Sequence, residues 1–346
     1  MKEGVKYAGG LLLTALLFAW VLRGTDLGIV WRQIRAASPW ALVGCAALNF
    51  GHNLFRVWRW QALLKPTRAG VGFRAAFVAV VVGYLTTWVV PGRLGELVRP
   101  LLLSSREGVP LGPCIGTVVA DRLLDAATIA ALFAVGSLTT PLAGPAAQHA
   151  DLLRHGSLVL VGCAIAGLLG MLVLAHASPA MAAWLERGPR PLRWLARIAA
   201  EVSHGATALA RPRLAALVIL NSLAAWLAIA LGTWLGIRAV GADLAFGAVL
   251  VILPMLALGV ALPTPGGAGG YHGAMKVGLV AFGIAESAAV SAGLLIHVVI
   301  TVPILITGCV LLWTEGISWR EVRASAAGMR RLGARGAPAS VVENAS

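Results

Sequence analysis

The stretch VVPGRLGELVRPLLL, residues 89–103, places three charged side chains in a run that is otherwise almost entirely apolar. Arg93, Glu96 and Arg99 follow one another at intervals of three residues, so they lie towards one side of a helix. A Pro-Gly pair in front of them stops any helix that enters from the preceding apolar run. The stretch is therefore typical of a broken helix that brings charges into an apolar environment.

The composition of the whole chain indicates that this environment is a lipid bilayer. The 346 residues are 59% hydrophobic and only 12% charged, whereas a soluble domain has about 25% charged residues. Apolar runs of about 20 residues recur along the chain, and each can cross about 30 Å of hydrocarbon. No small-residue cleavage site follows the first run, which is expected to be a retained span. The sequence predicts an all-α, polytopic integral membrane bundle.

Basic residues in the loops predict how the chain crosses the membrane. Residues 56–74, residues 187–213 and the C-terminal tail are rich in arginine and should face the cytoplasm, whereas residues 137–153 should face outwards. About six full spans fit this pattern only if residues 71–103 and 246–283 form re-entrant hairpins. The two hairpins would enter from opposite sides, as in transporters built from inverted repeats, and both termini would be cytoplasmic.

Each predicted hairpin contains proline and glycine residues that break its helix near the tip. The predicted helix-break residues are Pro91, Gly92, Gly95, Pro263, Pro265, Gly266 and Gly267. Residues 1–318 are expected to form one transmembrane domain, and residues 319–346 a disordered cytoplasmic tail. Apolar residues between about 187 and 204 recur at helical spacing opposite a basic face. They predict an amphipathic helix on the inner surface, with a solvated basic loop as the alternative.

The charges of residues 89–103 are candidates for anion binding. A helix that restarts after the Pro-Gly break presents free N–H groups, and Arg93 and Arg99 add positive charge beside them. Glu96 would hold one arginine in place or relay a proton. The alternative is an interfacial turn with a solvated salt bridge.

Two further groups of charges lie within or beside apolar runs. In ADRLLDAA, Arg122 and Asp125 are three residues apart and share a helix face, so they would bind a ligand or form a structural ion pair. In RVWRWQALL, Arg56 and Arg59 lie where a span meets the headgroups. They are interpreted either as a phosphate clamp or as arginines that snorkel beside a tryptophan belt.

The segment LPTPGGAGGYHGAMK, residues 262–276, is a second helix break at which an anion could bind. A helix should restart near Tyr271, with His272 in its first turn and Lys276 one turn further on. His297 is interpreted as a packed histidine. The four cysteines lie in separate apolar runs without a metal-binding or redox spacing, so neither a cofactor nor a metal is predicted.

Four motifs in order, RVWRWQALL, PGRLGELVRPLLL, DRLLD and LPTPGGAGGYHGA, resemble the membrane region of lysylphosphatidylglycerol synthases, which also occurs alone as a flippase-like domain. The resemblance covers about residues 5–318 and implies translocation of a lipid between leaflets. The soluble domain that makes the aminoacyl-lipid has no counterpart in the 28 residues after residue 318, so aminoacylation is not expected. Many relatives carry an acid where this chain has His272. Residues that match motif positions are Arg93, Glu96, Arg99, Arg122, Asp125 and His272.

These observations predict a transporter of the inner (plasma) membrane that moves an anionic phospholipid or a polyprenyl-phosphate-linked lipid. One alternative is a membrane-embedded lipid- or glycosyl-transferase with Glu96, Asp121, Asp125 or His272 as its base. Another is a non-catalytic membrane partner of a cytoplasmic lipid-modifying enzyme. The net charge of +14 is attributed to cytoplasmic loops and anionic headgroups, and nucleic acid is not an expected partner.

Overall fold

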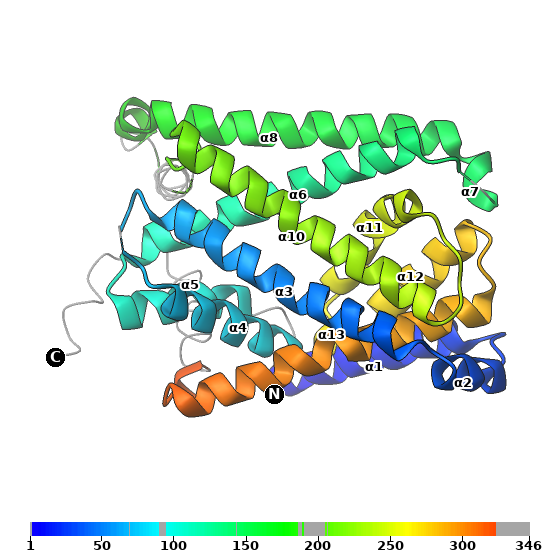
Figure 1. Ribbon diagram of the computed structural model, residues 1–346. Helices are drawn as coiled ribbons and strands as arrows, with labels where there is room; N and C mark the ends of the chain where they lie inside the picture. The colour runs from blue at the N-terminus through cyan, green and yellow to red at the C-terminus, as the bar shows by residue number, and fades with distance from the viewer. Residues whose placement is uncertain are drawn as a thin grey trace.

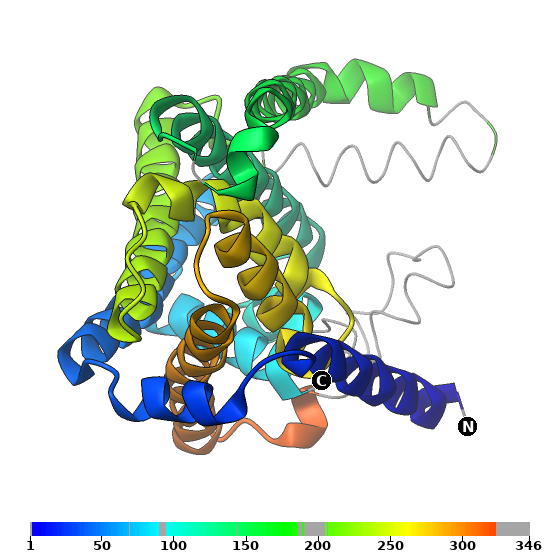
Figure 2. The same ribbon diagram turned by 90° about the vertical axis from the view of Figure 1, so that its right-hand side faces the viewer.

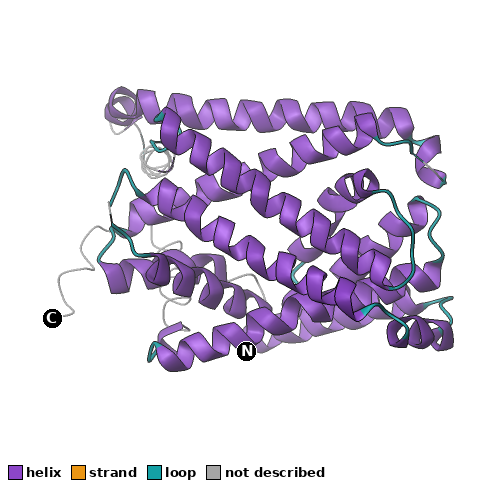
Figure 3. Ribbon diagram, viewed as in Figure 1, coloured by secondary structure: helices purple, strands orange, loops and turns teal. Residues whose placement is uncertain are grey.

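The computed structural model describes residues 2–68, 70–89, 95–142, 144–185, 189, 205 and 207–322, which form a bundle of helices (Figure 1). Within these ranges no strand is present, which confirms the all-α prediction (Figure 3). Three predicted site residues, Pro91, Gly92 and Arg93, lie outside the described residues. So do the proposed amphipathic helix at 187–204, apart from residue 189, and the tail beyond residue 322.

Long helices make up most of the described bundle. They are α1 (Lys2–Leu22), α3 (Pro39–Leu64), α6 (Leu111–Thr139), α8 (Ala150–Leu185), α10 (Pro212–Ala239) and α13 (Glu286–Thr314). Their 21 to 36 residues correspond to about 31–54 Å at the rise of an α-helix. Figure 1 shows α3, α6, α8, α10 and α13 running along the long dimension of the molecule, and the short α7 (Pro145–Gln148) joins α6 to α8.

Hydropathy separates these helices into two kinds. Among the described residues, α10, α13 and the Ala150–Val173 part of α8 have mean hydropathies of 2.3 to 2.5, high enough for a membrane span. A fourth candidate is α1 together with α2 (Leu27–Arg35), which is bent from it by 91°. The helices α3 and α6 are of similar length, but α3 carries two arginines in its C-terminal half and α6 carries three charged side chains near its middle. The protein is a multi-pass membrane protein, and the count of six full spans stays a prediction.

Two pairs of short helices occupy the segments predicted as hairpins. The first pair is α4 (Phe73–Val89) and α5 (Gly95–Glu107), and the second is α11 (Phe246–Ala261) and α12 (Gly270–Ala281). The helices of each pair pack against each other, and the two pairs enter the bundle from opposite ends (Figure 1). Figure 2, which looks from one end, shows α11 and α12 in the middle of the bundle with α10 and α13 around them. Their re-entrant path through lipid stays a prediction.

A pair of glycines lets the two helices of each hairpin approach closely. In the first hairpin, a Cβ at Gly95 would overlap the carbonyl oxygen of Gly83. In the second, a Cβ at Gly259 would lie 2.6 Å from the carbonyl oxygen of Gly270. Both pairs include the first residue of the second helix, so the two hairpins use the same packing device. Gly95, predicted as a break residue, thus begins α5 and has a packing role.

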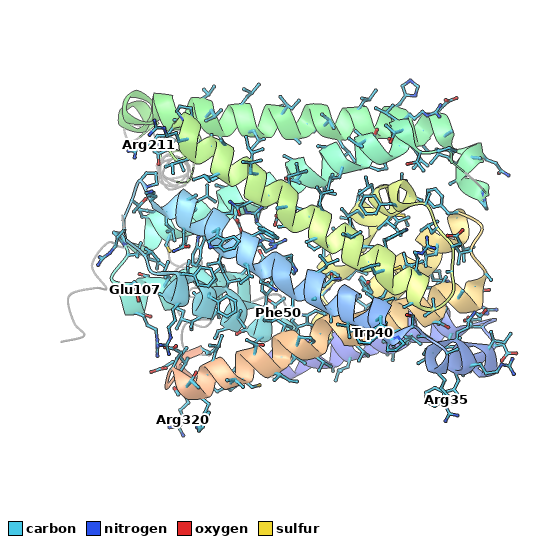
Figure 4. The ribbon with its side chains drawn as sticks, viewed as in Figure 1. Arg35, Trp40, Phe50, Glu107, Arg211 and Arg320 are labelled. Atoms are coloured by element: carbon cyan, nitrogen blue, oxygen red, sulfur yellow. The ribbon has the colours of Figure 1, made fainter. Side chains whose placement is uncertain are left out.

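Polar contacts mark the two ends of the bundle. Glu315, just after α13, pairs with Arg74 of α4 at 2.8 Å and with Arg106 of α5 at 3.7 Å. Figure 4 places Glu107, Arg211 and Arg320 towards this end, and Arg35 and Trp40 towards the other. Residues 319–322 are helical and Val322 is buried, so the ordered domain continues past the predicted boundary at residue 318.

Candidate functional site

Two arginines of α3 meet two aspartates of α6 in the middle of the bundle. Arg59 Nε lies 2.7 Å from Oδ1 of Asp121, and Arg59 Nη1 lies 2.9 Å from Oδ1 of Asp125. Arg56 Nη1 lies 3.1 Å from Oδ2 of Asp125. Spacings of three and four residues put each pair on one helix face, so the two faces can meet. The side chains of Arg59 and Asp121 have no exposed surface.

Residues of α5 and one further arginine of α6 extend this set. Arg99 Nη1 lies 2.8 Å from Oδ2 of Asp121, and its guanidinium lies 3.8 Å from the ring centroid of Trp60. Arg122 lies 3.2 Å from both Asp121 and Asp125 and 3.7 Å from Glu96. We call the seven charged residues the charge network: Arg56, Arg59, Glu96, Arg99, Asp121, Arg122 and Asp125. Its four arginines exceed its three carboxylates, which leaves one positive charge.

The charge network lies deep along the helices that carry it. Arg56 is eight residues from the end of α3, and Arg122 is eleven residues from the start of α6. These separations correspond to about 12 Å and about 17 Å along the helix axes. A hydrocarbon core is about 30 Å thick, so helices that cross it with these residues inside would place both groups within the core. Charges at this depth are costly to desolvate, and those that line a polar path are candidates for function.

A cavity of about 400 Å³ lies against the charge network. Its walls come from α3, α4, α5, α6, α10, α11, α12, α13 and the 3-10 turn η1 (Pro265–Gly267). We call the part lined by Arg56, Glu96, Arg122 and Asp125 the charged end. Other lining residues include Tyr84, Trp226, Leu253, Leu256, Val260, Ile300 and Ile304. Ligand sites commonly have volumes of about 300–1,000 Å³, mostly apolar walls and a few polar groups, as this cavity does.

The tips of both hairpins contribute to the cavity wall and touch each other there. Trp88 lies at the end of α4, and Gly266 lies in η1 between α11 and α12. A Cβ at Gly266 would come within 2.5 Å of the Trp88 ring, and Gly266 has a positive φ of 60°. Only glycine adopts this conformation readily and leaves room for the ring. The two hairpins that enter from opposite ends therefore meet at the cavity.

The predicted site residues take different places around this cavity. Arg56, Glu96, Arg122 and Asp125 line it, as do the break residues Gly266 and Gly267. Arg59 and Arg99 lie behind them as buried, ion-paired supports for the aspartates. Pro263 and Pro265 flank Thr264 in the break between α11 and α12.

The two predicted site residues of α12 do not line the cavity. Lys276 Nζ donates a hydrogen bond to the carbonyl oxygen of Val21 at 2.6 Å, and it pairs with Glu286. A lysine suits this place because carbonyl groups at the end of α1 have no partner within the helix. His272 Nδ1 accepts a hydrogen bond from the N–H of Gly269, so it caps the start of α12. Its ring packs beside the ring of His297 at 4.6 Å.

Asp121 and His297 were considered from the sequence, as a candidate base and a packed histidine, but their places in the site were not predicted. Asp121 shares a helix face with Asp125, but its contact with three arginines depends on how α3, α5 and α6 pack. His297, interpreted as a packed histidine, lines the cavity. Asn49 and Asn53 also line the cavity, and a sequence pattern could have revealed them, because they recur with Arg56 at helical spacing on α3.

The arrangement favours anion binding over acid–base chemistry. Asp121 and Asp125 are engaged by arginines, and the Nδ1 atom of His272 is engaged in the cap. Glu96, about one third exposed and 3.7 Å from Arg122, is the more loosely held carboxylate. No group of residues in the described part of the chain could hold a metal ion.

Comparisons with known proteins agree with this architecture. Residues 7–308 match the family described as lysylphosphatidylglycerol synthase TM region. The chain is also similar to the glycosyltransferase AglD of Haloferax volcanii, with 27% identity over 328 residues. That match covers 85% of this chain and 52% of AglD, so the chain spans about half the length of this curated relative. Because the family match extends over most of the chain, from the first long helix into the last, the protein belongs to the lysylphosphatidylglycerol synthase TM region family.

Proposed function

We propose that the protein moves an anionic lipid between the leaflets of the inner (plasma) membrane and holds the lipid headgroup in the cavity. The substrate would be a phospholipid or a polyprenyl-phosphate-linked lipid. One observation carries the proposal: the tips of two opposed hairpins meet at a cavity that has Arg56 and Arg122 on its wall. Such a cavity offers a phosphate fixed positive groups in place of the water that it loses.

The charge balance of the network supports an anionic substrate. Four arginines and three carboxylates leave an excess positive charge, which one phosphate would neutralise. Guanidinium groups bind phosphate oxygens through charge-assisted, often paired hydrogen bonds. Arg122 is about one third exposed, whereas Arg59 and Arg99 are buried among their partners. We therefore assign phosphate contact to Arg122 and Arg56, and support to the other two.

The hairpins supply elements that can move. Transporters with opposed broken helices alternate access by shifting one repeat against the other around a central site. In this protein the hairpins meet through a side chain and a glycine, Trp88 and Gly266, without a hydrogen bond between them among the described contacts. The end with Arg74, Arg106, Arg211 and Arg320 would face the cytoplasm by the positive-inside rule.

Leaflet transfer in liposomes tests this function. We expect the wild-type protein to move a fluorescent anionic phospholipid, and Arg122→Ala to slow the transfer by about ten- to hundredfold, the value of a hydrogen bond to a charged group. Asp121 and Asp125 keep Arg56, Arg59 and Arg99 as partners, so this variant should still fold. Arg238→Ala is the matched control, because Arg238 is half exposed and pairs with an exposed aspartate, and neither residue lines the cavity. Equal transfer by both variants would remove Arg122 from the site.

A second candidate is suggested by the name of AglD, a glycosyltransferase. A transferase needs a base near the phosphate, and Glu96 is the carboxylate that the network leaves most accessible. Transfer of a sugar from an added nucleoside diphosphate sugar to a lipid phosphate, with release of the nucleoside diphosphate, would favour this activity if the purified protein performs it in detergent, where leaflets are absent. Absence of product in detergent together with leaflet transfer in liposomes would exclude it in favour of transport.

A further inference from the structure

Uncharged polar and aromatic residues form another part of the cavity wall, beside the charged end. We call this part the neutral end, and it is lined by Asn49, Asn53, Trp88, Thr264, Tyr271 and His297. We infer that the neutral end binds an uncharged, hydroxyl-rich group, most simply a sugar, that is joined to the lipid phosphate held by Arg56 and Arg122. This inference rests on the proposed transport function and specifies its substrate class as a glycosylated lipid phosphate.

The two ends are arranged in a line that suits such a headgroup. On α3, Asn49 and Asn53 lie seven and three residues before Arg56, and all three line the cavity. At the rise of an α-helix this row extends over about 10 Å. A phosphate beside Arg56 would therefore place the next group of the headgroup against the two asparagines.

Polar atoms at the neutral end have no hydrogen-bond partner in the protein. They are Oδ1 of Asn53, Oγ1 of Thr264 and Nδ1 of His297, and each is buried. Buried polar atoms without partners are costly, so native proteins rarely retain them without a reason. A sugar hydroxyl both donates and accepts hydrogen bonds. After small side-chain rotations, sugar hydroxyls could therefore form hydrogen bonds with the amide oxygen, the threonine hydroxyl and the ring nitrogen.

Aromatic rings complete the neutral end. The ring of His297 lies 5.1 Å from that of Trp88 and 5.4 Å from that of Tyr271, both in edge-on geometry. Such rings offer apolar faces next to polar edges. That combination matches a pyranose, which has an apolar C–H face and hydroxyl groups around its rim.

The distribution of charge argues against an aminoacylated headgroup. The charged residues that line the cavity in the described chain, Arg56, Glu96, Arg122 and Asp125, all belong to the charged end. A lysyl or other aminoacyl group would bring an ammonium ion into the neutral end without a counter-charge. Burying an unpaired charge is far more costly than burying a hydroxyl that finds a partner. The cavity thus selects a neutral group next to the phosphate.

The test compares three fluorescent lipids in liposomes that contain the full-length protein. They are a prenyl phosphate that carries one hexose, the same prenyl phosphate without hexose, and a lysyl-phosphatidylglycerol. We expect the wild-type protein to transfer the hexose lipid at least about tenfold faster than the lysyl lipid. The reason is that the ammonium group of the lysyl lipid would be buried in the cavity without a counter-charge. Thr264→Val should slow the hexose lipid about fivefold, the effect of one lost hydrogen bond, and leave the bare phosphate lipid unchanged.

Thr301→Val is the matched control for this substitution. Thr301 also has a buried Oγ1 without a partner, but it does not line the cavity. Equal effects of the two variants, or equal transfer of the hexose and lysyl lipids by wild type, would overturn the inference while transport itself stands. Transfer of none of the three lipids by wild type would overturn the proposed function, and the inference with it.

Discussion

At the scale of single residues, Asp121 organises the site. Its carboxylate lies within 3.2 Å of Arg59, Arg99 and Arg122, which come from three different helices. A buried ion pair gains little net stability, but removing one partner leaves the other charges uncompensated in a low-dielectric interior. Asp121 therefore holds Arg122 at the cavity, and Arg59 and Arg99 behind it, without lining the cavity itself.

We predict that Asp121→Asn destabilises the protein by about 3–5 kcal/mol, because the buried Arg59 and Arg99 lose their shared carboxylate. Thermal unfolding in detergent, followed by a tryptophan or thiol probe, measures this change. Asp243→Asn is the control, since this side chain is 91% exposed and should change stability by less than about 0.5 kcal/mol. Similar unfolding temperatures for both variants would show that the ion pairs of Asp121 do not stabilise the fold.

Residue types and spacing predicted part of this site. Arg56, Glu96, Arg122 and Asp125 were identified because charges in apolar runs are rare, and all four line the cavity. The sequence could not show that Arg56 pairs with Asp125, because 69 residues separate them. The position of Lys276 was equally unpredictable, since the carbonyl group that it binds belongs to Val21, 255 residues away.

At the scale of elements, the two hairpins share a construction despite their different sequences. Each has a glycine on its first helix packed against the first glycine of its second helix, Gly83 with Gly95 and Gly259 with Gly270. Small residues at these points let the backbones approach, as they do where membrane helices pack closely. The shared device supports an internal structural repeat between the two segments.

Gly270→Ala is predicted to destabilise the second hairpin by about 1–3 kcal/mol, because the added Cβ would overlap the carbonyl oxygen of Gly259. Gly162→Ala on α8 is the matched control, since no atom lies within 4 Å of its Cβ position. That control should keep or slightly raise the unfolding temperature, because alanine favours a helix more than glycine does. A lower unfolding temperature for the control than for Gly270→Ala would contradict the packing role.

The two short helix pairs were the most predictable elements, although their re-entrant path stays a prediction. Charge counting and Pro/Gly breaks placed them at 71–103 and 246–283, and the helix pairs occupy Phe73–Glu107 and Phe246–Ala281. The contact between their tips was not predictable, because it depends on the fit of Trp88 against Gly266, which are far apart in the sequence. The sequence pattern predicts where the helices lie along the chain, whereas the contacts between them depend on the shapes of side chains that are distant in the sequence.

At the scale of the whole molecule, each of the two hairpins is fixed by ion pairs at its own end of the bundle. Glu315 ties α13 to the first hairpin through Arg74 and Arg106, and Glu286 pairs with Lys276 of the second hairpin. Each hairpin is thus held at the end from which it enters. Contacts of this kind would have to loosen if a hairpin moves during transport.

The orientation of the molecule gives a test at this scale. We predict that a cysteine in place of Lys65 reacts with a membrane-impermeant thiol reagent from the cytoplasmic side, and one in place of Asp243 from the outer side. Both positions are exposed, and they lie at opposite ends of the bundle. The background should carry Cys163→Ala and Cys309→Ala, because these two cysteines are exposed. Labelling of both positions from one side would contradict the re-entrant path.

The most direct measurement is photo-crosslinking of an anionic lipid that carries a diazirine beside its phosphate, followed by mass spectrometry of the labelled peptides. If the headgroup enters the cavity, crosslinks will appear on residues 49–56 of α3 and 122–129 of α6, and excess unlabelled lipid will suppress them. Crosslinks confined to the exposed apolar face of α8, such as Leu158, Val159 and Ile165, would mean that the lipid stays outside the bundle and that the cavity is not its site.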